Sequence, residues 1–141
     1  MAYTAQEVAH YVITKCVNDG YPISNLQLQK ILYFLQVASI RAGRGVAFED
    51  EMEAWQYGPV IPAVYYEFGR YGAMPIIATY SDMCISGPDR ELFDPVIVSC
   101  YKKTAWQLVE ESHREGGAWK RIYGGAGTRR TISKEVLEQY G

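Results

Sequence analysis

Residues 24–42 constrain the fold more than any other stretch, because their apolar side chains recur at helical spacing on several sides of one helix. Ser24 followed by Gln27 is a capping-box pattern, which predicts a helix start at Asn25 or Leu26. The apolar set comprises Leu28, Ile31, Leu32, Tyr33, Phe34, Leu35, Val37, Ala38 and Ile40, and the remaining polar arc comprises Gln27, Gln29, Lys30, Gln36 and Arg41. A helix that is apolar most of the way round is normally buried. We therefore predict a central buried helix over about residues 25–42, too short and too polar to span a membrane.

Length and charge limit the classes of protein to consider. The chain has 141 residues, enough for one domain with a real hydrophobic core, so we expect a single domain over residues 1–141. The formal net charge of −2 argues against nucleic acid as the main partner, because that binding depends on clustered Lys and Arg. Three cysteines without a C-x-x-C pair, Cys16, Cys84 and Cys100, indicate reduced thiols. The first residues lack a signal-peptide pattern, and we expect a cytoplasmic protein.

Two further helices and a hairpin are predicted in the first half of the chain. Thr4 with Glu7 forms a capping box that opens a helix to about Asn18, and the short link after it makes this helix an antiparallel neighbour of the central one. Residues 46–48 and 52–57 are interpreted as a small antiparallel hairpin, closed by Gly58 and Pro59. Pro62 is well placed as the first residue of a helix over about residues 63–71.

The second half is predicted to be helical after a loop at residues 73–87. Asp89 is a possible helix cap, but Pro95 favours a helix that starts there and runs over residues 95–103. A third capping box, Thr104 with Gln107, predicts a helix over residues 105–113 with Trp106, Leu108 and Val109 in the core. A helical turn at 118–123 is anchored by Trp119, residues 124–130 form a loop, and a last helix follows Ser133. The fold class is mainly α with a small antiparallel β hairpin, an α+β domain.

Few residues suggest catalysis or metal binding. Glu110, Glu111, His113 and Glu115 stand close together in the sequence, and carboxylates with an imidazole serve acid/base chemistry or metals. However, no H-x-x-x-H or H-E-x-x-H spacing is present, and His113 at the end of a helix also suits a capping role. The glycine-rich residues 124–128 lack the Lys and Ser/Thr of a phosphate-binding loop. We expect no catalytic residue, no metal and no cofactor.

The aromatic content is the unusual feature of the composition. The chain has 12 tyrosines and 3 tryptophans, and tyrosine is enriched at protein interfaces because it joins an apolar ring to a polar tip. Trp55, Tyr65 and Trp119 are interpreted mainly as core residues, whereas Tyr57 and Tyr66 suit an interface equally well. The basic pairs are Lys102 with Lys103, Lys120 with Arg121, and Arg129 with Arg130. They are either solvated charge, the default interpretation, or a place that holds a phosphate or an acidic partner surface.

Three motifs in order carry a resemblance to a known family. They are LQKILYFLQ at residues 28–36, EAWQYGPVIPAVY at residues 53–65 and SHREGGAW at residues 112–119. Together they resemble the Panacea domain family of SocA-like antitoxins and phage-associated GepA-type proteins, over about residues 5–123. Residues 74–90 and 124–130 match none of its motifs.

The resemblance implies a helical, non-enzymatic protein that acts by protein–protein interaction. The implied function is that of an antitoxin in a toxin–antitoxin system, which neutralises a cognate toxin, encoded by a neighbouring gene, through direct binding. We expect partner contact at Tyr57, Gly58, Pro59, Tyr66, Tyr71 and Trp119. We expect structural roles within the motifs for Leu28, Lys30, Tyr33, Phe34, Trp55, Tyr65 and His113. Specificity for one toxin is expected in variable surface such as residues 74–90.

Three alternatives stay open at this point. The family is also associated with adaptors that deliver a partner to a protease. An enzyme or metal protein built on His113 and the neighbouring glutamates is a different class. A DNA-binding repressor is suggested by the short helices, but the acidic net charge and the lack of a basic recognition helix count against it.

Overall fold

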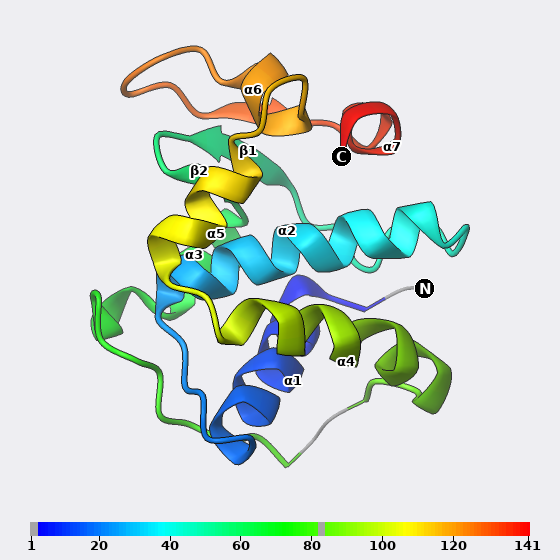
Figure 1. Cartoon of the computed structure of the whole chain (residues 1–141), viewed down its shortest axis with the longest axis vertical. Coiled ribbons are helices and arrows are strands. Elements are labelled where there is room, and N and C mark those ends of the chain that lie inside the picture. The colour runs from blue at the N-terminus through cyan, green and yellow to red at the C-terminus, as the bar shows by residue number, and fades with distance from the viewer. Residues whose placement is uncertain (1–2, 82–83) are drawn as a thin grey trace.

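The computed structural model describes residues 3–81 and 84–141 (Figure 1). Within these residues the chain forms seven α-helices and one three-stranded sheet. The helices are α1 (Ala5–Asn18), α2 (Asn25–Arg41), α3 (Pro62–Glu67), α4 (Gly87–Tyr101), α5 (Ala105–Ser112), α6 (Ala118–Ile122) and α7 (Lys134–Tyr140), and a 3-10 helix, η1 (Gly69–Tyr71), follows α3. The strands are β1 (Met52–Trp55), β2 (Gly58–Val60) and β3 (Arg130–Ile132). The predicted fold class, mainly α with a small antiparallel sheet, is confirmed.

Helix α2 is the centre of the molecule. Its capping box is complete: Gln27 N donates to Ser24 Oγ (3.3 Å) and Ser24 N donates to Gln27 Oε1 (2.8 Å). The helix contacts α1, α3, α4, α5, α7 and β2. Figure 1 shows α1 and α4 on one side of α2 and the sheet with α6 and α7 on the other. The prediction of a central buried helix is therefore confirmed.

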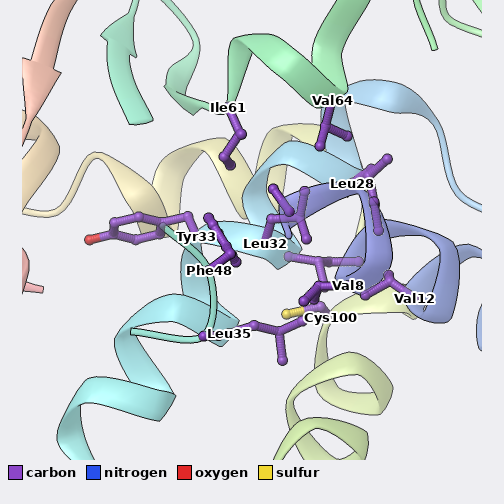
Figure 2. Packing of buried hydrophobic residues seen from close by; sticks show 14 of the residues in the cluster. Val8, Val12, Leu28, Leu32, Tyr33, Leu35, Phe48, Ile61, Val64 and Cys100 are labelled. Carbon is purple, nitrogen blue, oxygen red and sulfur yellow. The ribbon is translucent and has the colours of Figure 1, made fainter. Parts of the chain in front are cut away.

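The hydrophobic core forms around α2 because every neighbouring element directs apolar side chains at it. Figure 2 shows the packing, in which side chains from α1, α2, α3, α4 and the segments beside them meet. The labelled residues are Val8, Val12, Leu28, Leu32, Tyr33, Leu35, Phe48, Ile61, Val64 and Cys100. All are buried. In the described residues no helix is long and apolar enough to cross a membrane.

The strand pairing of the hairpin differs from the prediction. Strand β1 pairs with β2, with Trp55 opposite Gly58, and with β3, with Met52 opposite Ile132. Gly58 and Pro59 thus lie in the second strand and do not close the hairpin, and residues 46–48 are not its partner strand. They contribute one isolated bridge, from Phe48 to Tyr3. Strand β3 was not predicted: residue 130 was assigned to the preceding loop, and three residues are too few to show the alternation of a strand.

Residues 46–48 stay outside the sheet because a side chain of α2 satisfies their main-chain groups. Ala47 N donates to Gln36 Oε1 (2.7 Å), and Gln36 Nε2 donates to Phe48 O (2.9 Å). A buried main-chain group needs a partner, and an amide side chain supplies a donor and an acceptor at once. Tyr3 N donates to Ala47 O (3.2 Å), so the segment is satisfied without pairing with a strand of the sheet.

The prediction that a helix starts at Pro95 was also wrong. Helix α4 runs from Gly87, Ser86 caps it by accepting from Asp89 N (3.3 Å), and Pro95 lies inside it. A proline in a helix removes one main-chain hydrogen bond, and the freed carbonyl belongs to Glu91. Both residues are exposed, so water can satisfy that carbonyl. The capping boxes at Thr4 and Thr104, Pro62 at the start of α3 and the Ser133 cap of α7 are as predicted.

Candidate partner-binding surface

The polar side chains that interrupt the apolar surface of α2 are largely buried. Gln29, Lys30 and Gln36 all lie inside the molecule. Gln29 Oε1 accepts a hydrogen bond from Ile61 N (2.9 Å), at the point where β2 passes into α3. Asn25 Nδ2 donates to Tyr65 O in α3 (3.0 Å). These groups satisfy buried main chain next to α2, which a purely apolar helix could not do.

Lys30 is the most unusual member of this set. Its side chain is 0 % exposed, and its Nζ donates to Pro59 O (2.9 Å). Within the described residues no carboxylate forms an ion pair with it. Burial disfavours the charged form and lowers the pKa of Lys30 from 10.5 to about 7. The first family motif thus places a lysine of near-neutral pKa beneath β2.

Gly58 leaves the space that Lys30 occupies. Its backbone φ is +110°, a conformation that glycine adopts easily and other residues rarely adopt. A Cβ at this position would lie 2.6 Å from Lys30 Cε and 2.7 Å from Ser112 Oγ. The three residues come from the three separate sequence motifs, at residues 28–36, 53–65 and 112–119. The motifs therefore meet at one buried point.

A stack of rings fixes the third motif against the sheet. His113, at the C-cap position of α5, lies parallel to Trp119 with ring centroids 3.5 Å apart, and Trp119 lies on Tyr123 at 4.6 Å. Trp119 Nε1 donates to Trp55 O in β1 (2.7 Å). Burial, together with the positive charges of Lys30 and Lys120, lowers the pKa of His113 to about 4. The ring is therefore neutral near pH 7 and packs as an aromatic surface.

We expect Trp119→Phe to lower the free energy of unfolding by about 1–3 kcal/mol, because it keeps most of the stack but leaves the Trp55 carbonyl without its donor. Urea unfolding of both proteins measures this difference. Trp106→Phe is the matched control. Trp106 is 59 % exposed, so its substitution should change stability by no more than about 0.5 kcal/mol. Equal losses in the two variants would contradict the role of the indole N–H.

The acid/base or metal cluster proposed around His113 is not assembled. Glu110, Glu111 and Glu115 are exposed, and two of them form surface ion pairs: Glu111 with Lys103 (2.7 Å) and Glu115 with Lys120 (3.6 Å). The His113 ring instead faces Trp119, and its Nε2 is buried without a hydrogen-bond partner. Among the described residues no three His, Cys, Asp or Glu side chains are placed to hold a metal ion.

The outer surface next to these motifs carries exposed aromatic rings. Tyr57 in the β1–β2 turn is 47 % exposed, and Tyr66 on α3 is 62 % exposed. Trp106 was predicted to be a core residue, and this was wrong. It is the second residue of α5 and lies two residues before Leu108, so it points away from the face that carries Leu108. Its ring meets Tyr57 edge to face, with centroids 5.3 Å apart.

A hollow, which we call the aromatic groove, lies beside these rings. It has a volume of about 480 Å³, and its walls include Leu26, Trp55, Tyr57, Tyr65, Gly69 and Arg129. These residues come from the start of α2, the β1–β2 hairpin, α3, η1 and the loop before β3. In Figure 1 the loop before β3, drawn in orange, extends past the β1–β2 turn. The groove is therefore built from segments distant in sequence.

The residues expected to contact a partner fall into two groups. Tyr57 and Tyr66 are exposed, and Tyr71 is half-buried against Phe68. Gly58, Pro59 and Trp119 are buried, so their contact with a partner stays a prediction, while the structure gives them the packing roles described above. Among the expected structural residues Leu28, Lys30 and Tyr33 are buried, and Phe34, Trp55, Tyr65 and His113 are half-buried.

Sequence reasoning did not reveal that Arg129 and Gly69 line the same groove as Trp55. Arg129 was noted only as part of a basic pair, and the structure puts its Cζ 4.0 Å above the Trp55 ring. Gly69 was not singled out at all. No local pattern joins residues 55, 69 and 129, so only the fold could reveal that they share one groove.

The fold and its surface define a small helical protein in which the three motifs build a rigid frame beneath exposed aromatic side chains. The profile of the Antitoxin SocA-like, Panacea domain family matches residues 28–120, and the chain belongs to this family. The chain is also similar to Antitoxin SocA of Caulobacter vibrioides (strain NA1000 / CB15N). The two are 33 % identical over 147 residues, which covers 96 % of this chain and 78 % of that protein. No solved structure gives a significant match. Family membership supports an antitoxin role.

Proposed function

We propose that this protein is an antitoxin that neutralises a cognate protein toxin by binding it directly. Its likeness to a curated antitoxin over 96 % of the chain is the observation that carries the proposal. The toxin would be encoded by a neighbouring gene. In the described structure the most distinctive surface is aromatic, which suits protein binding rather than the turnover of a small substrate.

The physical basis is occlusion of the toxin by a preorganised aromatic surface. Tyr57 is held against Trp106, and Trp55 meets Tyr65 edge to face at 5.0 Å, so these rings are already oriented before a partner arrives. Tyr and Trp are the residues that most often dominate binding energy, and fixed side chains lose less entropy on association. A few such contacts suffice for tight neutralisation.

Co-expression tests the proposal. The neighbouring open reading frame is expressed alone and together with this protein, growth is scored, and the pair is passed through affinity purification. Growth arrest by the neighbour alone, rescue by this protein and a stable co-purifying complex are the expected results. Rescue with loss of the neighbour protein would instead favour an adaptor that delivers it to a protease. A toxic neighbour that this protein neither rescues nor binds would contradict the proposal.

A further inference from the structure

The aromatic groove has the size and the lining of a site for one inserted side chain and the main chain that carries it. Its volume of about 480 Å³ falls within the range of ligand pockets, about 300–1,000 Å³. Trp55, Tyr57 and Tyr65 provide aromatic walls, and Leu26 adds an aliphatic one. Pockets of this kind, apolar and partly enclosed, are where interface anchors bind.

The charge of the groove is as informative as its shape. Among the residues that the structure describes, Arg129 is the only charged one that lines it, and no carboxylate does. The guanidinium lies over the Trp55 ring and its Nη1 donates to Tyr66 Oη (3.0 Å). Within the described residues no acidic group pairs with it. Glu53 accepts from Trp55 Nε1 (2.8 Å) and is not among the lining residues.

Arg129 therefore keeps most of its hydrogen-bonding capacity for a partner. A guanidinium carries five N–H donors in a rigid fork that matches a carboxylate, and one contact to a tyrosine hydroxyl leaves most of them unused. Stacking on an aromatic ring holds the fork in place without satisfying its charge. In a chain of net charge −2, this positive spot selects an acidic group.

We infer that the aromatic groove binds a segment of the toxin that carries an aromatic or large aliphatic side chain next to an Asp or Glu. The apolar side chain fills the space between Trp55, Tyr57 and Tyr65, and the carboxylate pairs with Arg129. This inference rests on the proposed function, because the occupant belongs to the toxin. It adds the site and the chemistry of the segment that is bound.

Two variants test the two halves of the inference. Gly69→Leu fills the groove without removing any native side chain, since an added Cβ at Gly69 would meet no atom within 4 Å. Arg129→Glu reverses the charge. Gly87→Leu is the matched control, because Gly87 also has open space around it but begins α4 and does not line the groove. Thermal unfolding establishes that the variants are folded.

The dissociation constant of the purified toxin complex is the quantity to measure. We expect Gly69→Leu and Arg129→Glu each to weaken binding by about 100-fold or more, and Gly87→Leu to change it by less than about twofold. Toxin variants selected to restore binding to the Arg129→Glu protein are expected to replace an Asp or Glu by Lys or Arg.

Each other outcome overturns part or all of the inference. If wild-type protein binds the toxin and Gly69→Leu binds equally well, the groove is not the site. If only Arg129→Glu keeps its affinity, the carboxylate contact is wrong. A homodimer that Gly69→Leu dissociates would assign the groove to a second copy of this chain. If the wild-type protein neither binds nor neutralises the neighbour, the proposed function itself fails, which these variants do not decide.

Discussion

Gly58→Ala is expected to lower the free energy of unfolding by about 3 kcal/mol or more. Two costs combine at this position. The backbone φ of +110° is strained for any L-residue by about 1–3 kcal/mol, and the new Cβ would lie 2.6 Å from Lys30 Cε and 2.7 Å from Ser112 Oγ. Neither neighbour moves easily. Lys30 is fully buried and bonded to Pro59 O, and Ser112 Oγ donates to Val109 O (2.8 Å).

Gly125→Ala separates the two costs. Gly125 has nearly the same φ, +108°, but a Cβ there would meet no atom within 4 Å, so this variant carries only the backbone strain. Urea unfolding of both variants gives the difference that arises from crowding. Removing Ser112 Oγ in a Gly58→Ala, Ser112→Ala double variant should recover part of the loss, and a double-mutant cycle measures that coupling. If the two alanine variants lose equal stability and show no coupling to Ser112, the crowding argument is wrong.

The helical part of the fold was predictable because its signals are local. Thr4, Ser24 and Thr104 each stand before a Glu or Gln at the capping-box spacing, and each caps the helix that was expected there. The burial of the apolar residues of α2 followed from their spacing alone. What these signals share is that the residues that decide the structure lie within one helical turn of each other.

The sheet and the burial of polar residues were not predictable in this way. Residues 46–48 resemble a strand, but Gln36 satisfies their main chain, and that contact depends on the fold. Lys30 looks exposed by type, because lysine is almost never fully buried. Its burial depends on β2 crossing above α2 and placing the Pro59 carbonyl within reach.

For the candidate site, the sequence indicated which residue types would matter but not how they are placed. The aromatic content drew attention to Tyr57 and Tyr66, which are exposed, but Trp106 was wrongly assigned to the core. The aromatic groove joins Trp55 to Arg129, and they are brought together by the pairing of β1 with β3. A three-residue strand carries too weak a pattern to predict that pairing.

Lys30→Met is expected to remove the contribution with which Lys30 raises stability between pH 7 and about 10. The pKa of Lys30 is lowered from 10.5 to about 7 in the folded state, so between these values the unfolded chain binds more protons. The contribution of Lys30 to stability therefore increases with pH across this window, by at most about 4–5 kcal/mol in total. Below pH 7 the lysine is charged in both the folded and the unfolded state, so it does not make the free energy of unfolding depend on pH there. The full cost of its buried charge remains in that range.

The variant should change the sign of its effect with pH. Below pH 7, methionine removes the cost of a buried charge but leaves the Pro59 carbonyl without a donor, which costs about 1–3 kcal/mol, so Lys30→Met is expected to be the more stable protein. Near pH 10 only the lost hydrogen bond counts, and the wild type is expected to be the more stable. Urea unfolding of both proteins at pH 6, 8 and 10 measures the difference in stability at each end of this range.

Two internal references make this result interpretable. Lys102→Met alters an exposed lysine and should leave the pH dependence between 7 and 10 in place. The pKa of His113 is lowered to about 4, so its contribution rises with pH between about 4 and 6.5 and is separate from that of Lys30. It should persist in Lys30→Met, moved toward higher pH because one of the positive charges that lower this pKa is gone. Stability curves of wild type and Lys30→Met that run parallel from pH 6 to 10 would show that folding does not lower the pKa of Lys30, and that water reaches it beneath β2.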